Sequence, residues 1–306
     1  MEHIYDMIII GGGPAGYTSA LYGARAGLDV LVIEKMSAGG QMALTGDIEN
    51  YPGFIDGIDG FTLGANMQMS AERFGAKTEY AEVIALNLNA NPKEIVTAEK
   101  TYFSKTVVIA TGADPRPLGL EKEKELIGRG VHYCAHCDGR FYKDKTVAVV
   151  GGGNSAVADA LYLSRLAKKV YLIHRRDTLR ATKIYHEPLM KAENVEFIKN
   201  CVLTNITASP RVSEIKLEDV ITKAKKSLEC DGVFISIGRQ PTTVLVKDML
   251  PLDESGYIIA DETTKTKIAG VYAVGDVRTK ALRQIVTATA DGAVAVHFAE
   301  EYISQL

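Results

Sequence analysis

The sequence predicts an α/β fold built from two similar domains, the second of which is inserted into the first. One observation behind this prediction is a glycine-rich turn that occurs twice, as GGGPAG at 11–16 and as GGGNSA at 151–156. Each turn stands between a short apolar run and a helical pattern, and a second apolar run follows, so each belongs to a Rossmann-like βαβ unit. The other observation is that two apolar strands, TVVIATGA at 106–113 and GVYAVGDV at 270–277, flank the second unit. They indicate that the chain returns to its first domain after completing the second.

The composition of the 306 residues is that of a globular protein long enough for two buried cores. Charged residues make up 24% of the chain and the net charge is −3, so we expect no basic surface for nucleic acid or an anionic membrane. No apolar run approaches the roughly 18 residues that span a bilayer, and the start MEHIYDMIII lacks the positive charge of a signal peptide. We therefore expect a cytoplasmic protein, and its four cysteines are too few for a disulfide scaffold.

The first turn has a glycine at each of the three positions where a dinucleotide-binding turn requires one. Gly11 makes the tight turn, Gly13 lets the backbone approach a pyrophosphate, and Gly16 allows the helix to pack closely on the strand. The N-terminus of that helix stabilises the charge of the phosphates. The second strand, DVLVIEK, ends in Glu34, whose carboxylate can accept hydrogen bonds from a ribose diol. These residues predict a nucleotide with a free 2′-hydroxyl group.

The second turn fills the same three positions with Gly151, Gly153 and Ala156. Where the first unit has an acid, however, the second strand KVYLIHRRD and the turn after it supply basic residues: His174, Arg175, Arg176 and Arg180. A carboxylate would repel a 2′-phosphate, whereas planar guanidinium groups bind one through paired hydrogen bonds. The second unit is therefore predicted to bind NADP(H). The alternative is that these residues form only a solvated basic turn.

The segments in which the chain passes between the two domains contain proline and have the composition of loops. They are ADPRPLG at 113–119 and RQPTTVL at 239–245. We therefore expect residues 1–115 and 244–306 to form the first domain and residues 116–243 to form the inserted one.

The segment GVHYCAHCDG at 130–139 holds two cysteines two residues apart, and this spacing fits two kinds of site. One is a zinc site, and the other is a dithiol that opens and closes as a disulfide. A structural zinc site usually needs two such pairs, and the isolated Cys201 and Cys230 do not supply the second. A metal site within this one loop would have to use Cys134, Cys137, His132 and His136.

The whole arrangement resembles the low-molecular-weight, bacterial-type thioredoxin reductases, and the match runs essentially end to end. The segments that carry it are GGGPAGYTSALY, GGQMALTGDIENYPGF, VVIATGA, CAHCDG, GGGNSAVADALYL, HRRDTLR, SIGRQP and YAVGDVRTKALRQIVTATADG. The resemblance implies FAD in the first domain, NADPH in the inserted domain and a redox-active disulfide between Cys134 and Cys137. It further implies a homodimer whose partner is thioredoxin or a thioredoxin-like protein.

The resemblance also implies a role for each residue of the CxxC segment. Cys137 would be the sulfur next to the flavin, and Cys134 would attack the disulfide of thioredoxin. Asp138 matches the general acid of the family, which protonates the leaving sulfur. The alternative function is that of a reductase of the same fold that serves another dithiol protein or is driven by ferredoxin. The intact GGGNSA and HRRDTLR segments argue against ferredoxin.

Two positions near the cysteines depart from the family pattern. His136 stands where the family more often has threonine, and an imidazole there either changes the dithiol or is a tolerated surface residue. Arg140 replaces an aromatic residue found in some members. It precedes Phe141 and Tyr142, which resemble the aromatic pair where thioredoxin docks. Cys201 and Cys230 are expected to be buried small hydrophobic residues.

The predicted cofactor-binding residues combine the two turns with positions that match the family. For FAD they are Gly11, Gly13, Pro14, Ala15, Gly16, Glu34, Lys35, Gly39, Gly40, Gln41, Asn50, Val83, Thr111, Gly112, Asp276, Arg283 and Gln284. For NADPH they are Gly151, Gly153, Asn154, Ser155, Ala156, His174, Arg175, Arg176 and Arg180. Asn154 and Ser155 have an alternative role as helix N-caps. No metal is expected.

Overall fold

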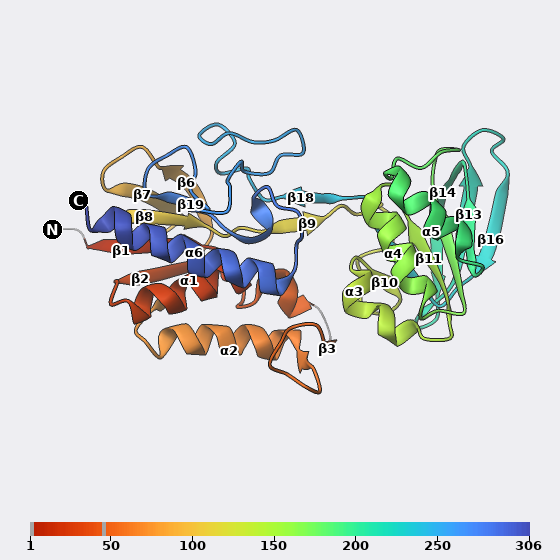
Figure 1. Cartoon of the computed structure of the whole chain (residues 1–306), viewed down its shortest axis with the longest axis horizontal. Coiled ribbons are helices and arrows are strands. Elements are labelled where there is room, and N and C mark those ends of the chain that lie inside the picture. The colour runs from red at the N-terminus through yellow and green to blue at the C-terminus, as the bar shows by residue number, and fades with distance from the viewer. Residues whose placement is uncertain (1–2, 45–46) are drawn as a thin grey trace. The chain divides into compact units, whose positions relative to one another are not determined.

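A computed structural model describes residues 3–44 and 47–306 of the chain (Figure 1). The chain divides into two compact units, and we call Met1–Asp114 with Gln240–Leu306 the outer unit and Pro115–Arg239 the inserted unit. The predicted α/β fold is confirmed, because each unit contains parallel strands with helices packed against them, and in the outer unit β6 and β7 extend the parallel part of the sheet as antiparallel strands. The nucleotide that each unit binds remains a prediction.

The outer unit is built on a seven-stranded sheet. Its order is β5-β2-β1-β8-β7-β6, with β19 beside β8. The bounds are β1 Ile4–Ile10, β2 Val30–Glu34, β5 Lys77–Tyr80, β6 Val83–Asn87, β7 Lys93–Thr97, β8 Thr101–Ile109 and β19 Val271–Ala273. Strand β1 lies between the parallel strands β2 and β8, and its last four residues are buried. Burial on both faces explains why this strand is a continuous apolar run rather than an alternating pattern.

Three helices pack in the outer unit: α1 Pro14–Arg25, α2 Gly60–Glu72 and α6 Ile285–Ile303 (Figure 1). Helices α1 and α6 cross closely, since the Ser19 hydroxyl donates to the Gly292 carbonyl at 3.2 Å. A Cβ atom on Gly292 would lie 2.4 Å from the Ala15 carbonyl oxygen, so only glycine fits there. The short elements are η1 Gly40–Leu44, β3 Asp47–Ile48, β4 Ile58–Asp59 and η4 Gly275–Val277.

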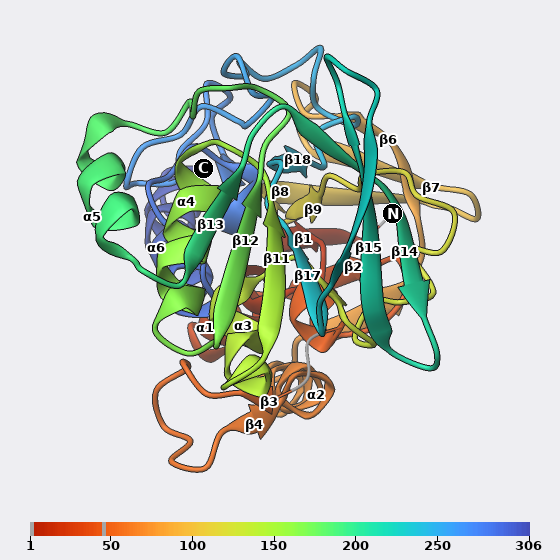
Figure 2. The same cartoon turned by 90° about the vertical axis from the view of Figure 1, so that its right-hand side faces the viewer.

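The inserted unit contains a five-stranded parallel sheet of order β10-β17-β11-β12-β13 and a three-stranded antiparallel sheet β14-β15-β16 (Figure 2). The parallel strands are β10 Val131–His132, β11 Thr146–Val150, β12 Lys169–Ile173, β13 Val195–Ile198 and β17 Gly232–Ile235. The antiparallel strands are β14 Cys201–Ala208, β15 Val212–Asp219 and β16 Lys225–Glu229. The helices are α3 Ala135–Asp138, η2 Gly139–Tyr142, α4 Asn154–Ser164, η3 Lys183–Tyr185 and α5 His186–Lys191.

The two crossing segments form strands that pair with each other, β9 Ala113–Pro115 and β18 Arg239–Pro241. The Thr242 amide donates to the Gly112 carbonyl, and the Arg116 amide donates to the Gly238 carbonyl, both at 3.0 Å. The loops expected at the crossings are therefore partly extended and hydrogen-bonded.

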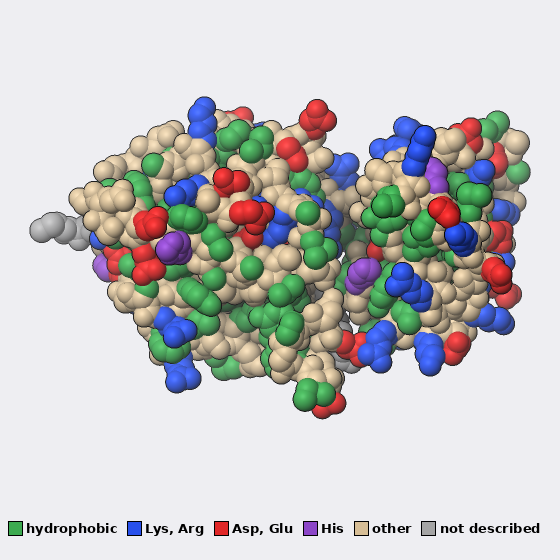
Figure 3. Space-filling model, viewed as in Figure 1, with side chains coloured by type: hydrophobic (Ala, Val, Ile, Leu, Met, Phe, Trp, Pro, Cys, Tyr) green, Lys and Arg blue, Asp and Glu red, His purple; other side chains and the backbone are tan. Residues whose placement is uncertain are grey.

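Two surface properties bear on the excluded functions. In the described part of the chain, no helix has the length and apolarity needed to cross a membrane. On the face drawn in Figure 3, basic and acidic side chains are interspersed rather than gathered into a patch of one sign.

Candidate active site

The glycine turn of the outer unit depends on backbone contacts that leave no room for a side chain. Gly11 has a φ of +106°, and a Cβ atom there would lie 2.4 Å from the Ala110 carbonyl oxygen. A Cβ atom on Gly16 would lie 1.9 Å from the Gly11 carbonyl oxygen. Gly13 is the N-cap of α1, and a Cβ atom there would meet no atom of the described residues within 4 Å. The first and third glycines therefore close the turn, while the second faces open space at a helix N-terminus.

Glu34 is fixed beside this turn by two backbone amides. Its Oε2 accepts from the Gly12 amide at 2.6 Å, and its Oε1 accepts from the Met36 amide at 2.9 Å. A carboxylate has about four lone-pair directions, so Glu34 retains capacity for ribose hydroxyl groups. Lys35, which is also predicted to bind FAD, is exposed and forms an ion pair with Glu82 at 2.7 Å.

Residues 39 and 40 lie directly against the turn. The Gly39 amide donates to the Gly12 carbonyl at 2.8 Å. A Cβ atom on Gly40 would come within 3.4 Å of the Gly13 Cα atom. Both glycines have positive φ values, +100° and +54°, which favour glycine at these positions. The structure thus brings these two predicted residues to the helix N-terminus.

Gly275 and its neighbour Asp276 reach the same end of α1, because a Cβ atom on Gly275 would lie 3.0 Å from the Cβ of Ala15. The Gly275 amide donates to Asp291 Oδ2 at 2.8 Å, and Asp291 also accepts from buried Arg278 at 2.7 and 2.9 Å and from Lys280 at 2.8 Å. Burial alone would raise the pKa of Asp291, but the hydrogen bonds from these two cations hold it below its usual value. Sequence reasoning missed this network.

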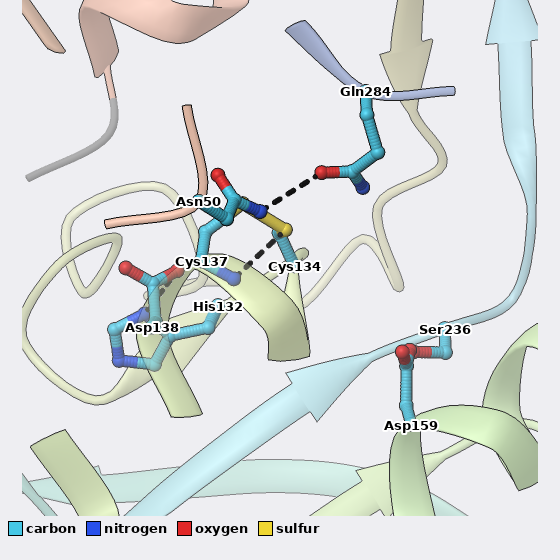
Figure 4. The surroundings of a disulfide bond; sticks show 8 residues. All are labelled: Asn50, His132, Cys134, Cys137, Asp138, Asp159, Ser236 and Gln284. Atoms are coloured by element: carbon cyan, nitrogen blue, oxygen red, sulfur yellow. Dashed lines mark hydrogen bonds and ion pairs between the residues drawn. A yellow bond between two sulfur atoms is a disulfide. The ribbon is translucent and has the colours of Figure 1, made fainter. Parts of the chain in front are cut away.

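The remaining predicted FAD residues lie on other segments of the outer unit. Asn50 Nδ2 donates to Gln284 Oε1 at 3.0 Å, and Gln284 is the N-cap of α6 (Figure 4). The Arg283 guanidinium stacks 3.8 Å above the Tyr257 ring, and Gln41 donates to Asp114 at 2.7 Å. Val83 begins β6, whereas Thr111 and Gly112 follow β8.

The glycine turn of the inserted unit repeats the geometry of the first. A Cβ atom on Gly151 would lie 2.3 Å from the Ser236 carbonyl oxygen, and Gly153 again faces open space among the described residues. Gly153, rather than Asn154 or Ser155, is the N-cap of α4, so the alternative role of these two residues as N-caps is wrong. Instead, Asn154 Oδ1 accepts from the Thr182 amide at 2.8 Å and holds the following loop.

The basic segment folds back onto this second turn. The Gly152 carbonyl accepts from the Arg180 amide at 2.7 Å and from the Ala181 amide at 3.1 Å. The side chains of Arg175, Arg176 and Arg180 are exposed. The three guanidinium groups are therefore accessible to an anion bound near the turn.

His174 has an environment unlike that of the three arginines. Its side chain is buried, and a Cβ atom on Gly152 would lie 2.4 Å from its ring. Burial, and then the positive charges of Arg180, Arg176 and Arg175, lower the pKa of His174. Its Nε2 has no hydrogen-bond partner among the described residues. The imidazole therefore packs as a neutral ring beneath the turn.

Cys134 and Cys137 form a disulfide in the inserted unit (Figure 4). Cys134 is the N-cap of the one-turn helix α3, and its sulfur accepts from the Cys137 amide at 3.2 Å. Both cysteines are half-buried, and they follow strand β10, which ends at His132. Within 3–44 and 47–306, no group of three or more histidine, cysteine or acidic side chains is arranged to hold a metal.

Asp138 and His132 are in contact beside the disulfide (Figure 4). Oδ2 of Asp138 lies 3.1 Å from Nδ1 of His132, and the two side chains are 17% and 6% exposed. Nε2 of His132 lies 2.7 Å from the Tyr142 hydroxyl. The sequence singled out His132 only as a possible metal ligand, and nothing in the spacing pointed to this contact.

The aromatic pair after the CxxC segment is divided between surface and core. Phe141 is 48% exposed, but Tyr142 is only 2% exposed. The expectation that both rings dock thioredoxin is therefore wrong for Tyr142, and only Phe141 is accessible. His136 is exposed, with its ring 4.3 Å from that of Tyr162 on α4.

The other two cysteines are buried, as predicted. Burial raises the pKa of both thiols, and that of Cys230 reaches about 12. A further acid, which the sequence did not indicate, is the half-buried Asp159 on α4, which accepts from the Ser236 hydroxyl just after β17 (Figure 4). Burial raises its pKa. This edge of a parallel sheet is where ligands bind.

Comparison with known proteins gives consistent matches over the chain. The family model for pyridine nucleotide-disulphide oxidoreductases matches residues 5–292. The thioredoxin reductases of Listeria innocua and Listeria monocytogenes are 46% and 45% identical, covering 100% of this chain and 96% of their own lengths. The crystal structure of thioredoxin reductase from Streptococcus pyogenes superimposes with a TM-score of 0.91 at 44% identity, and the match covers 100% of both chains.

Proposed function

The chain belongs to the thioredoxin reductases of the pyridine nucleotide-disulphide oxidoreductase family, and we propose that it passes electrons from NADPH through FAD and the Cys134–Cys137 disulfide to oxidised thioredoxin. Members of this family are NADPH-dependent flavoproteins. The observation that carries the proposal is the disulfide itself, which lies at the one-turn helix α3, and strand β11 leads from there to the glycine turn of the inserted unit. A flavin supplies the group that accepts electrons as a hydride and delivers them to a disulfide.

FAD is assigned to the outer unit. The open space at Gly13 and the uncapped N-terminus of α1 fit a pyrophosphate, and Gly39, Gly40 and Gly275 allow backbone to approach it closely. Glu34 accepts from ribose hydroxyl groups. The other residues that we assign to FAD are Gly11, Pro14, Ala15, Gly16, Lys35, Gln41, Asn50, Val83, Thr111, Gly112, Asp276, Arg283 and Gln284.

NADPH is assigned to the inserted unit. Gly153 faces open space at the N-terminus of α4, as Gly13 does at α1. Arg175, Arg176 and Arg180 bind the 2′-phosphate, which their exposure beside the turn supports. The other residues assigned to this site are Gly151, Asn154, Ser155, Ala156 and His174, with His174 acting through its packing against the turn.

The dithiol reduces its partner by disulfide exchange. The Cys134 thiolate forms a bond to one sulfur of the thioredoxin disulfide, whose own S–S bond breaks. Asp138 gives its proton to the leaving sulfur. Cys137 then displaces the second thioredoxin sulfur from Cys134, which restores the enzyme disulfide and leaves thioredoxin with two thiols. In the family, Cys137 is also the sulfur that receives electrons from the flavin.

Three further assignments follow the resemblance and the names of the relatives. The partner is thioredoxin or a thioredoxin-like protein, contacted through the exposed Phe141. The protein acts as a homodimer. Residence in the cytoplasm is supported by a dithiol that must be reducible to turn over.

An anaerobic titration tests the proposal. Two equivalents of NADPH, one for the Cys134–Cys137 disulfide and one for the flavin, should bleach the flavin absorbance of the holoenzyme, and an excess of oxidised thioredoxin should then restore it. In the Cys134→Ser variant, NADPH should still bleach the flavin while thioredoxin no longer restores the colour. Bleaching without recovery in the wild-type protein would assign another disulfide protein as the partner. No bleaching by NADPH would contradict the NADPH assignment and favour a ferredoxin-type donor.

A further inference from the structure

His132 is a buried titratable group that the exchange reaction described above does not use. It ends strand β10, where it pairs with Phe234 of β17. Its ring stacks on that of Phe234, with centroids 5.1 Å apart and planes 25° apart, and meets the Tyr142 ring edge-on at 5.2 Å. A ring held on two sides cannot turn without disturbing the core, so the two imidazole nitrogens keep their directions. One points to Asp138 and the other to Tyr142.

The Tyr142 hydroxyl decides which imidazole nitrogen carries the hydrogen. Burial raises the pKa of Tyr142, and hydrogen bonding from Arg211 offsets this only in part, so the phenol keeps its proton at neutral pH. The phenol hydrogen needs an acceptor, and of the two hydrogen-bond partners of this hydroxyl only the imidazole can accept, because the Arg211 guanidinium can only donate. The phenol hydrogen is therefore directed at His132 Nε2. Nε2 is then the acceptor, and Nδ1 carries the hydrogen that faces Asp138 at 3.1 Å.

We propose that His132 is a positioning residue for disulfide exchange, which donates its Nδ1–H to Asp138 and stabilises the carboxylate left after Asp138 gives up its proton. This inference rests on the proposed function. When the partner S–S bond breaks, its electron pair stays on the leaving sulfur, and that sulfur takes the proton of the Asp138 carboxylic acid. The resulting negative charge forms at a side chain that is 17% exposed, where a hydrogen bond to a charged acceptor is strong.

Two substitutions at His132 separate the two hydrogen bonds. His132→Asn places an amide N–H close to the position of Nδ1 and keeps the donor to Asp138. His132→Gln places its amide closer to the position of Nε2, toward Tyr142, and removes that donor. Tyr142→Phe keeps the buried ring and removes only the hydroxyl group that places the imidazole hydrogen on Nδ1. The holoenzyme of each variant is compared with the wild-type protein.

The substrates are chosen by their leaving groups. Oxidised thioredoxin and a disulfide-bonded CxxC peptide release aliphatic thiolates, which need a proton, whereas 5,5′-dithiobis(2-nitrobenzoic acid) releases a stable aromatic thiolate that does not. His132→Gln should lower kcat/KM about ten-fold for the aliphatic disulfides and leave the aromatic one within about two-fold, since acid catalysis is worth at least that much. His132→Asn should stay within about three-fold throughout, and Tyr142→Phe should fall between the two.

Several results would overturn the inference. An equal loss on aliphatic and aromatic disulfides would mean that His132 only maintains the fold of the CxxC segment. No loss for His132→Gln on the aliphatic disulfides would mean that Asp138 acts without it. Failure of the wild-type protein on thioredoxin alone would contradict the proposed partner, while the peptide disulfide would still decide the role of His132.

Discussion

The two glycine turns of this chain share the geometry of their first glycine. Gly11 and Gly151 both have positive φ values, and each lies under a carbonyl oxygen at the end of a neighbouring strand. An added Cβ atom would come within 2.4 Å of the Ala110 oxygen in the outer unit and within 2.3 Å of the Ser236 oxygen in the inserted unit. Glycine at this position is therefore required by the backbone of the protein itself, before any ligand is considered.

The third position of the turn differs between the units. In the outer unit, a Cβ atom on Gly16 would lie 1.9 Å from the Gly11 oxygen, so the helix leaves no space for even one methyl group. In the inserted unit, Ala156 occupies this position and its methyl group is fully buried. The first helix is therefore seated more tightly on its turn than the second, although both turns have the same sequence pattern.

The residue at the end of the second strand of each βαβ unit differs in chemistry between the units but occupies the same position in the fold. Glu34 contacts Gly12 and accepts from its amide, while the His174 ring lies against Gly152. In both units this residue therefore packs against the second glycine of the GGG sequence, Gly12 or Gly152. In our proposal, the charge that distinguishes the two nucleotides is carried by Glu34 itself in one unit, but by the exposed arginines that follow His174 in the other.

Gly16→Ala should have the largest effect, because the clash is with backbone and cannot be relieved by a rotamer change. We expect the outer unit to lose its bound flavin and the free energy of unfolding to fall by more than about 4 kcal/mol, in the range of severe core defects. The measurements are the flavin absorbance per chain after gel filtration and the urea unfolding curve.

The matched variant in the other unit is Ala156→Gly, which removes the methyl group that the second turn accommodates. It should cost about 1 kcal/mol through the lower helix propensity of glycine and leave the flavin in place. If both variants lowered the free energy of unfolding and the flavin content by similar amounts, the closer packing of the first turn would not contribute to stability.

Replacing both Arg175 and Arg176 with glutamine should have an intermediate effect. Each charge-assisted hydrogen bond to a phosphate is worth about 1.5–3 kcal/mol, but the exposure of these arginines weakens the bonds. We therefore expect KM for NADPH to rise by about ten-fold to about a hundred-fold. KM for NADH should hardly change, since NADH lacks the 2′-phosphate. Steady-state kinetics with both nucleotides make the comparison.

The control for this charge change is Lys191→Gln, which removes an exposed cation paired with Glu187 on α5. It should leave KM for both nucleotides unchanged. An equal rise for NADPH and NADH in the arginine variant would mean that these residues maintain the loop rather than bind the 2′-phosphate.

Much of the fold could be predicted because its signals are local. The apolar run before Gly11 and the one before Gly151 became the parallel strands β1 and β11. The repeated turn and the two flanking strands were enough to predict an inserted domain. These features depend on the backbone and on burial, which short sequence patterns record directly.

The side-chain networks could not be predicted in the same way. The contact between His132 and Asp138 depends on a helical turn, α3, that brings residues six apart to one side. Asp291 meets Arg278 and the Gly275 amide only because α6 returns to α1. Adjacent aromatic residues likewise gave no sign that Phe141 would be exposed and Tyr142 buried.

His174→Gln should have the smallest effect and tests whether this residue packs as a neutral ring. Because burial and the neighbouring arginines lower its pKa in the folded state, the unfolded chain binds a proton that the folded protein does not. Its contribution to stability is therefore present above the unfolded pKa of about 6.5 and is lost as the pH falls from that value through the lower pKa of the folded state. One proton can change stability by at most about 1.4 kcal/mol per pH unit. The measurement is the urea concentration at the midpoint of unfolding between roughly pH 7.5 and pH 5, which spans the unfolded pKa. As the pH is lowered, this midpoint should fall less steeply for the variant than for the wild-type protein.

The control is His297→Gln, which changes a histidine on α6 whose side chain is 68% exposed. It should keep the wild-type dependence on pH. If His174→Gln instead left the slope unchanged and raised KM for NADPH as strongly as the arginine variant, His174 would belong with the phosphate-binding group. The common place of Glu34 and His174 under the two turns would then be a shared contact with the nucleotide rather than a shared packing position.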